Sequence, residues 1–193
     1  MRYTIQRVPH GFDLMTPHAA EMWKQADTLF ADRFPWSEKP PSDLPEVCAR
    51  MLCTEDRIFV SFIVREKYIR AVNTAPNSPV CTDSCVELFL SADGQTYLNF
   101  EVNCIGTLLL CAGAGRENRR PVTGNCLENI RIATSLPCGQ KIESRPAPTE
   151  GWQMEMSFPI ALVTRELDCA APVRGTVWKG NFYKCGDRTP EPH

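Results

Sequence analysis

The sequence lacks any run of about 18 apolar residues, so it offers no candidate for a membrane-spanning helix. It also lacks an excess of positive charge. The net charge is −2 at pH 7, which argues against nucleic acid as a partner, because nucleic-acid-binding proteins usually carry a basic excess. The start, MRYTIQRVPH, has no apolar stretch of signal-peptide length. We therefore expect either a cytoplasmic protein or an extracellular or periplasmic protein from which a leader was removed.

The sequence has no C-x-x-C pair, and its three histidines, His10, His18 and His193, lie far from its cysteines. A zinc site needs nitrogen and sulfur ligands at characteristic spacings, so the sequence predicts none. An Asp-rich loop of the EF-hand type is missing as well. We expect no cofactor, while a structural calcium ion held by Asp83, Glu87 and carbonyl oxygens stays open as an alternative.

Cysteine is abundant, with 10 residues in a chain of 193. The cysteines are irregularly spaced, and several lie in apolar runs, where a free thiol behaves as a small hydrophobic side chain. A chain of this length buries a sizeable core without disulfide bonds. We expect mostly reduced thiols, with Cys81 and Cys85 close enough in the sequence for an occasional bridge.

Short alternating runs dominate the rest of the chain. RIFVSFIV at 57–64 and WQMEMSF at 152–158 are typical of strands, and a helical pattern occurs at 18–30. Neither an internal repeat nor a regular alternation of strands with helices is visible. The sequence therefore predicts an all-β fold: residues 1–193 form a single antiparallel β-sandwich, jelly-roll or immunoglobulin-like, with about 9–11 strands and one or two short helices.

The stretch 80–106 predicts a hairpin with one apolar and one polar face. Val86, Leu88 and Leu90 alternate with polar or aromatic residues, and the same alternation follows from residue 97 to 104. Asp93-Gly94 marks the turn. A loop with an odd number of residues keeps both apolar sets on one face. With Ser91–Gln95 as the loop, the predicted cross-strand pairs are Glu87 with Asn99, Cys85 with Glu101 and Asp83 with Asn103.

The polar face of this hairpin collects carboxylates and amides, framed by Phe89 and Tyr97. Asparagine is disfavoured in strands, so Asn99 and Asn103 in one strand indicate a local use. Carboxylates and amides suit the recognition of vicinal hydroxyl groups, because each side chain accepts or bridges a pair of hydrogen bonds. A solvated strand face with incidental amides is the alternative interpretation.

Four segments together resemble the carbohydrate-binding module family 9-like domains, which have a DOMON-like β-sandwich fold. The segments are VCTDSCVELFL, YLNFEVNCIG, GWQMEMSFP and NFYKCGD. The first segment is similar to that family's W-x-D-[DS]-x-V-E signature, and the resemblance runs from about Pro45 to the C-terminus. It implies a non-catalytic domain that binds glycans and is often attached to, or encoded among, polysaccharide-degrading enzymes.

The resemblance also implies site residues. The family's acidic positions match Asp83 and Glu87, its amides match Asn103 and Asn181, and its arginine falls close to Glu101. Members of the family hold a terminal sugar between two tryptophan rings. This sequence departs from that pattern, because the two tryptophan positions fall at Cys81 and near Lys184. Tyr183, Trp36 or Trp178 are the candidate replacements. Because the chain stops soon after NFYKCGD, we expect a C-terminal edge segment of the family to be missing.

We predict that a mono- or oligosaccharide is the ligand and that a polysaccharide-degrading enzyme is a further partner, with neither catalytic nor metal-binding residues. The predicted carbohydrate-binding residues are Asp83, Glu87, Glu101, Asn103, Asn181, Tyr183, Arg70, Arg119 and Trp36, with Arg116 as a further loop candidate. Two alternatives remain. One is a glycoside hydrolase in which Glu87 and Glu101 act as acid and base, although matching surroundings predict no difference between their pKa values. The other is a structural or interaction module whose sugar site has decayed.

Overall fold

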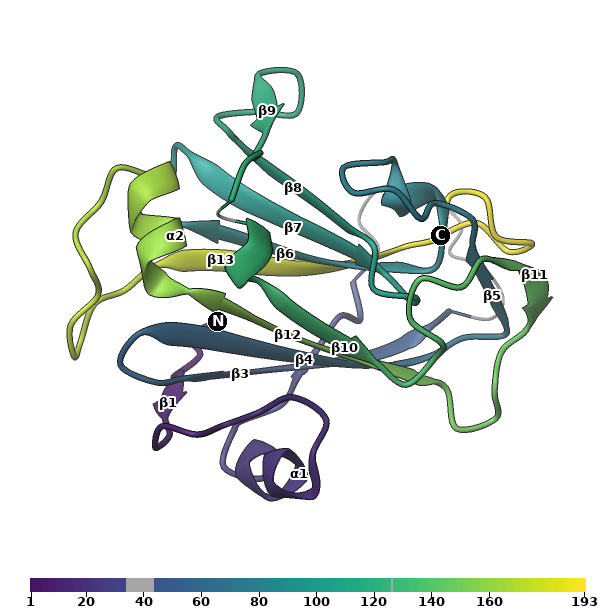
Figure 1. Ribbon diagram of the computed structural model, residues 1–193, viewed down its shortest axis with the longest axis horizontal. Coiled ribbons are helices and arrows are strands. Elements are labelled where there is room, and N and C mark those ends of the chain that lie inside the picture. The colour runs from purple at the N-terminus through teal and green to yellow at the C-terminus, as the bar shows by residue number, and fades with distance from the viewer. Residues whose placement is uncertain (34–43, 126) are drawn as a thin grey trace.

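Two β-sheets pack face to face in the computed structural model, which describes residues 1–33, 44–125 and 127–193 (Figure 1). The first sheet has the order β1-β3-β4-β12-β10, with β2 paired to β3, and the second has the order β13-β6-β7-β8-β9. A small sheet of β5 and β11 lies at one end of the sandwich. The all-β sandwich predicted from the sequence is confirmed.

The strands of the first sheet are β1 (Gln6–Arg7), β2 (Leu29–Phe30), β3 (Glu46–Cys53), β4 (Arg57–Arg65), β10 (Arg131–Thr134) and β12 (Trp152–Pro159). Those of the second are β6 (Cys85–Ser91), β7 (Tyr97–Asn103), β8 (Leu108–Gly113), β9 (Arg119–Pro121) and β13 (Lys179–Cys185), and the small sheet pairs β5 (Tyr68–Ala71) with β11 (Ile142–Pro146). The helices are α1 (Pro17–Trp23) and α2 (Ile160–Glu166), with 3-10 turns η1 (Val80–Thr82) and η2 (Leu127–Asn129).

The described residues thus form 13 strands, more than the 9–11 expected, because β1, β2 and β9 are only two or three residues long. Pairing is antiparallel except between β1 and β3, which run parallel. Within the described part of the chain, neither helix is long and apolar enough to cross a membrane.

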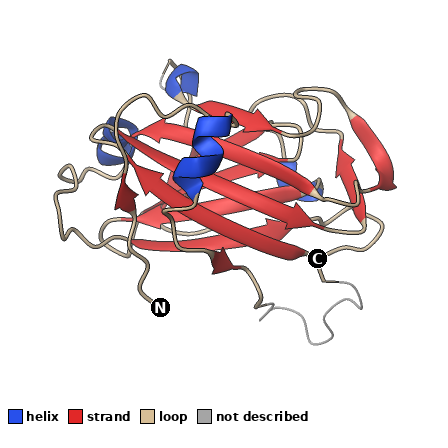
Figure 2. Ribbon diagram, turned by 90° about the horizontal axis from the view of Figure 1, so that it is seen from below, coloured by secondary structure: helices blue, strands red, loops and turns tan. Residues whose placement is uncertain are grey.

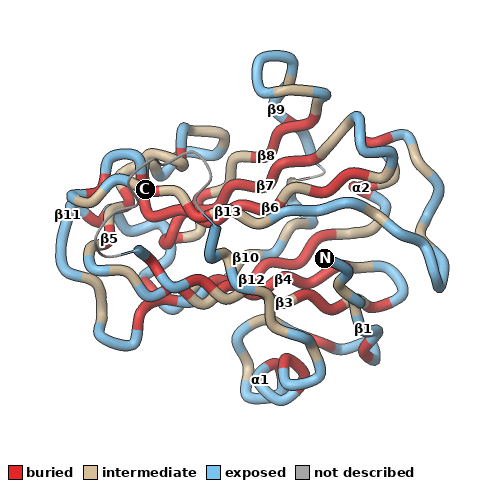
Figure 3. Tube along the Cα trace, turned by 180° about the vertical axis from the view of Figure 1, so that it is seen from behind, coloured by how far each residue is buried: buried red, intermediate tan, exposed pale blue. Residues whose placement is uncertain are grey.

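The core lies between the two sheets and follows from the period-two alternation. Val86, Leu88 and Leu90 of β6 point inward together with the apolar residues of β7 and β12, and all three are buried. Phe100 of β7 stacks on Phe158 of β12 with ring centroids 4.4 Å apart. In Figure 3 the buried segments run along the central strands of both sheets. Strand residues of the opposite parity must therefore face outward.

The outer face of the first sheet is covered by the N-terminal segment. Helix α1 begins after Thr16, whose side chain accepts a hydrogen bond from Ala19 N, and Pro17 occupies its first turn. Trp23 packs edge-on against Phe12, and its indole N–H donates to Glu155 of β12 at 2.8 Å. Figure 2 shows the helix in front of the strands. Helix α1 lies on the first sheet, away from the outer face of the second sheet (Figure 1), where Glu87, Asn99 and Glu101 are nevertheless buried.

The β6–β7 hairpin has the predicted faces but not the predicted register. The observed pairs are Glu87 with Glu101, Cys85 with Asn103 and Phe89 with Asn99, a shift of two residues. The cause is the turn: Asp93 Oδ1 accepts hydrogen bonds from the backbone N–H groups of Gln95 (2.7 Å) and Thr96 (2.9 Å), so the loop extends to Thr96. A shift of two residues preserves the face on which each side chain lies.

Asp93 is expected to hold this turn together. Its N–H donors, those of Gln95 first and Thr96 second, lower the pKa of its carboxyl to about 2. Asp93→Ala should lower the melting temperature by roughly 2–4 °C, as the loss of a backbone cap does in a domain of this size. The difference from the wild type should persist from neutral pH to about pH 4 and shrink as the pH falls toward 2, where the native carboxylate is protonated.

Thermal unfolding followed by circular dichroism at pH 7 and pH 2.5 measures this effect. Asp93→Asn keeps the acceptor oxygen and should retain most of the stability, whereas the exposed Asp32→Ala serves as the control. Equal melting temperatures for Asp93→Ala and the wild type at pH 7 would show that the turn does not depend on the carboxylate.

Candidate functional site

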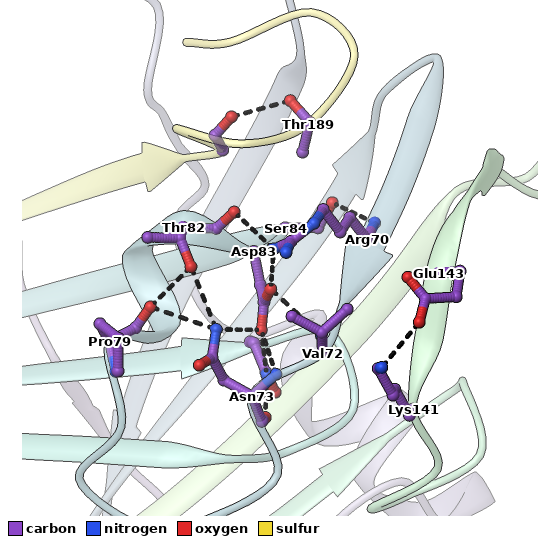
Figure 4. Close-up of polar contacts among 12 residues, drawn as sticks. Arg70, Val72, Asn73, Pro79, Thr82, Asp83, Ser84, Lys141, Glu143 and Thr189 are labelled. Carbon is purple, nitrogen blue, oxygen red and sulfur yellow. Dashed lines mark hydrogen bonds and ion pairs between the residues drawn. The ribbon is translucent and has the colours of Figure 1, made fainter.

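Asp83 is completely buried where the chain passes from η1 into β6. Its carboxylate accepts hydrogen bonds from Arg70 (2.6 Å) and from the backbone N–H groups of Val72 (3.1 Å) and Asn73 (3.0 Å). The side-chain amide of Asn73 donates to it as well, at 3.0 Å (Figure 4). These donors come from β5 and the residues that follow it, so Asp83 ties the small sheet to the second sheet.

Asn103, at the end of β7, completes this network. Its Nδ2 donates to Asp83 Oδ2 at 3.0 Å and to the carbonyl of Asn73 at 2.9 Å, and its Oδ1 accepts from the backbone N–H of Thr107 at 2.8 Å. We call Arg70, Asn73, Asp83 and Asn103 the buried brace. The sequence predicts that Arg70, Asp83 and Asn103 bind the ligand; the structure brings them together, in hydrogen bonds to one another and to the backbone.

A second polar group lies on the outer face of the second sheet. Glu87 of β6 stands between two direct cross-strand partners, Glu101 of β7 and Tyr183 of β13. In the next row, Phe89 stands between Asn99 and Asn181. We call Glu87, Asn99, Glu101 and Arg119, with the rings of Phe89, Tyr97 and Tyr183, the outer-face cluster.

The polar members of the cluster are held by short contacts. Arg119 of β9 forms an ion pair with Glu101 Oε1 at 3.1 Å, and Asn99 Nδ2 donates to the same oxygen at 2.7 Å. The thiol of Cys185 donates to Glu87 Oε1 at 3.0 Å. Glu101 is 2% exposed and Glu87 is 7% exposed, so both carboxyl groups are shielded from bulk water.

Three aromatic rings border these carboxylates. The ring of Phe89 contacts Tyr97 at a centroid distance of 5.2 Å and Tyr183, edge to face, at 5.3 Å. All three rings are half-buried, and Asn181 beside them is exposed. The outer face therefore combines an aromatic wall with convergent polar groups, the combination typical of small-molecule sites.

The two glutamates have different electrostatic surroundings. Burial, and then the charge of Glu101, raises the pKa of Glu87 to about 7. Burial also raises the pKa of Glu101, but the Arg119 guanidinium opposes that rise. The expectation of matching surroundings was wrong: the two glutamates lie directly opposite each other, and within the described part of the chain an arginine contacts Glu101 but not Glu87.

The described residues contain no group of three His, Cys, Asp or Glu side chains arranged to hold a metal ion. The oxygens of Asp83, one of the ligands suggested for calcium, already accept hydrogen bonds within the buried brace. Cys81 and Cys85, which were suggested as an occasional disulfide pair, are both free thiols.

The sequence-family model of carbohydrate-binding family 9 matches residues 17–193 of the chain. The chain belongs to this family. A solved structure of a Bacteroides uniformis protein, described as carbohydrate-binding, is 30% identical, with a TM-score of 0.82 over 98% of this chain and 85% of that one. No curated protein sequence matches the chain.

Two solved structures of a family 9 module from Caldicellulosiruptor kristjanssonii share the fold. The complex with cellotriose is 12% identical, with a TM-score of 0.54 over 94% of this chain and 76% of that one. The complex with glucose is 14% identical, with a TM-score of 0.53 over 94% and 78%. At these identities the likeness concerns the fold alone.

The structure shows how the residues lie at the two positions where the sequence lacks the expected tryptophans. Lys184 points inward, with Nζ 2.9 Å from Glu66 Oε2 and both side chains almost fully buried. Its neighbour Tyr183 therefore faces outward toward Glu87. Cys81 is half-buried, Trp178 packs partly against the core, and Trp36 lies outside the described residues.

The structure adds members that the list of predicted site residues omitted. Asn99, Phe89 and Tyr97 lie on the same face as Glu87, and the alternation of the hairpin was the signal that could have included them. Cys185 could be found only from the pairing of β13 with β6. Among the loop arginines, Arg119 contacts Glu101 directly, while Arg116 acts on its pKa as a more distant charge.

Proposed function

We propose that the chain is a non-catalytic module that binds a mono- or oligosaccharide at the outer-face cluster. The observation that carries this proposal is the row of three rings beside buried carboxylate and amide groups. A sugar offers the matching pair of surfaces, an apolar C–H face and a polar rim of hydroxyl groups. Family membership and the cellotriose and glucose complexes of the C. kristjanssonii module support a saccharide as ligand.

We further propose that the module serves an enzyme that degrades polysaccharides, by holding that enzyme near its substrate. The support is the resemblance described from the sequence, since domains of this kind are often attached to such enzymes. An enzyme and its module gain effective concentration when the module holds the same polysaccharide chain.

Tyr183→Ala is expected to weaken saccharide binding about tenfold, because it removes one ring of the aromatic wall and the packing that depends on it. Isothermal titration calorimetry with glucose and cellotriose measures the affinity. Tyr68→Ala, a half-buried tyrosine of the small sheet, is the matched control and should bind like the wild type. Unchanged affinity in Tyr183→Ala would place the binding surface elsewhere.

One observation favours a module with a decayed site. Arg119 already pairs with Glu101, and the carboxylates have little exposed surface. This alternative predicts that the wild type gives no binding heat with any mono- or oligosaccharide of a broad panel. Binding of even one sugar that Tyr183→Ala weakens would exclude it.

Another observation favours a glycoside hydrolase. Glu87 and Glu101 face each other directly, and the raised pKa of Glu87 is the property of a general acid. Release of reducing sugar from a panel of polysaccharides tests this alternative, with Glu87→Gln as the inactive variant. Our proposal predicts no release by either protein.

A further inference from the structure

Two buried acceptor atoms in the outer-face cluster lack a donor. Among the residues that the structure describes, neither Glu101 Oε2 nor Asn99 Oδ1 has a hydrogen-bond partner. Asn99 is completely buried and Glu101 nearly so. A buried acceptor without a donor costs free energy, and native proteins contain few of them. Both atoms therefore call for a partner that brings N–H or O–H groups.

The charges around these acceptors are also unbalanced. Among the described residues, one guanidinium contacts this pair of carboxylates: that of Arg119 from β9, which pairs with Glu101 from β7 and not with Glu87 from β6. Strand β13 contributes the neutral side chains of Tyr183 and Cys185, and Arg116 acts only from a longer distance. With both carboxyl groups ionised, the cluster has one negative charge more than its contacting cation neutralises.

We propose that the outer-face cluster selects a saccharide that bears a protonated primary amine, such as a 2-amino-2-deoxy sugar; this inference rests on the proposed function. An ammonium group has three donors and no acceptor, whereas a hydroxyl group has a single donor. Its donors match in kind the acceptors that lack a partner, Glu101 Oε2 and Asn99 Oδ1, and it supplies the missing positive charge. The rings of Phe89 and Tyr97 favour a nearby cation as well.

Protons compete with such a ligand. Glu87 has a pKa of about 7, so it is largely protonated at pH 5 and carries its charge about half of the time at pH 7. The amine stays protonated over this range. The charged and titratable side chains that contact or face Glu87 are Glu101 of β7, Arg119 of β9, and Tyr183 and Cys185 of β13. Burial also raises the pKa of Glu101. The affinity for the amino sugar should therefore rise about tenfold from pH 5 to pH 7.

Calorimetric titration of the full chain with glucosamine, N-acetylglucosamine and glucose, at pH 5 and pH 7, tests the inference. At pH 7 we expect glucosamine to bind at least about tenfold more tightly than N-acetylglucosamine, which has the same ring without the charge. Equal or weaker binding of glucosamine overturns the amine preference but leaves the proposed function standing if glucose binds. A panel of sugars without any binding overturns both.

Three variants locate the effect. Glu101→Gln should bring the affinities for glucosamine and N-acetylglucosamine to within about twofold. Glu87→Gln should remove most of the difference in affinity between pH 5 and pH 7, and Glu101, whose pKa is also raised, accounts for the remainder. Glu150→Gln, in an exposed turn, should behave like the wild type. Circular dichroism checks that each variant is folded. If Glu101→Gln does not fold, the pH comparison of the wild type with Glu87→Gln decides, and an unchanged pH dependence in Glu87→Gln overturns the assignment.

Discussion

Asp83→Ala is expected to lower the free energy of unfolding by about 3–5 kcal/mol, the cost of removing one partner from a buried ion pair. The carboxylate receives donors from Arg70, Val72, Asn73 and Asn103. Alanine leaves these donors without their acceptor, and the N–H groups of Val72 and Asn73 are backbone groups that cannot turn away. In a domain of this size, the melting temperature should fall by roughly 10 °C.

Urea denaturation at pH 7 measures the change, with the exposed Asp32→Ala as the matched control. Asn103→Ala should cost less, about 1–3 kcal/mol, because Asp83 keeps its other donors. If Asp83 and Asn103 contacted the ligand instead, as predicted from the sequence, both variants would lose saccharide binding at an unchanged melting temperature. That pattern would contradict the buried brace.

Glu87→Gln is expected to stabilise the protein at pH 8 by about 2–3 kcal/mol and to leave it nearly unchanged at pH 5. Burial, and next the charge of Glu101, raises the pKa of native Glu87 from the ordinary 4.5 to about 7. Between these values the native state holds a proton that the unfolded chain has lost. The stability that this proton provides is complete below pH 4.5 and is lost as the pH rises through 7.

Glutamine keeps the shape of the side chain but carries no charge, so it avoids the cost of burying a carboxylate beside Glu101. Urea unfolding of the wild type and the variant at pH 5 and pH 8 gives the comparison, with Glu150→Gln as the control. The free energy of unfolding of Glu87→Gln should still depend on pH, but less than that of the wild type, because the pKa of Glu101 is also raised. Identical pH profiles for the variant and the wild type would show that Glu87 is not desolvated in solution.

Alternation along the strands predicted the sandwich and the face of each side chain in β6 and β7, since a period of two is a local property of the chain. The register was wrong by two residues because it depends on where the turn ends. Asp93 binds the N–H groups of Gln95 and Thr96, and the dipeptide Asp93-Gly94 alone does not specify that length.

The sequence alone could not predict which polar residues belong to the buried brace and which to the outer-face cluster, because this depends on segments that are distant along the chain. Asp83 and Asn103 share the polar character of Glu87, but β5 and the residues after it close over them. Cys185 reaches Glu87 from 98 positions away. Lys184, which occupies the expected tryptophan position, faces the interior because β13 pairs with β6 in the observed register.

The strict in–out alternation of β6, β7 and β13 has a consequence for how such a protein can change over generations. Positions 89, 97, 181 and 183 lie in the same rigid frame as the core but take no part in filling it. Evolution, or a combinatorial library restricted to these four codons, can therefore change the ligand preference with little loss of stability.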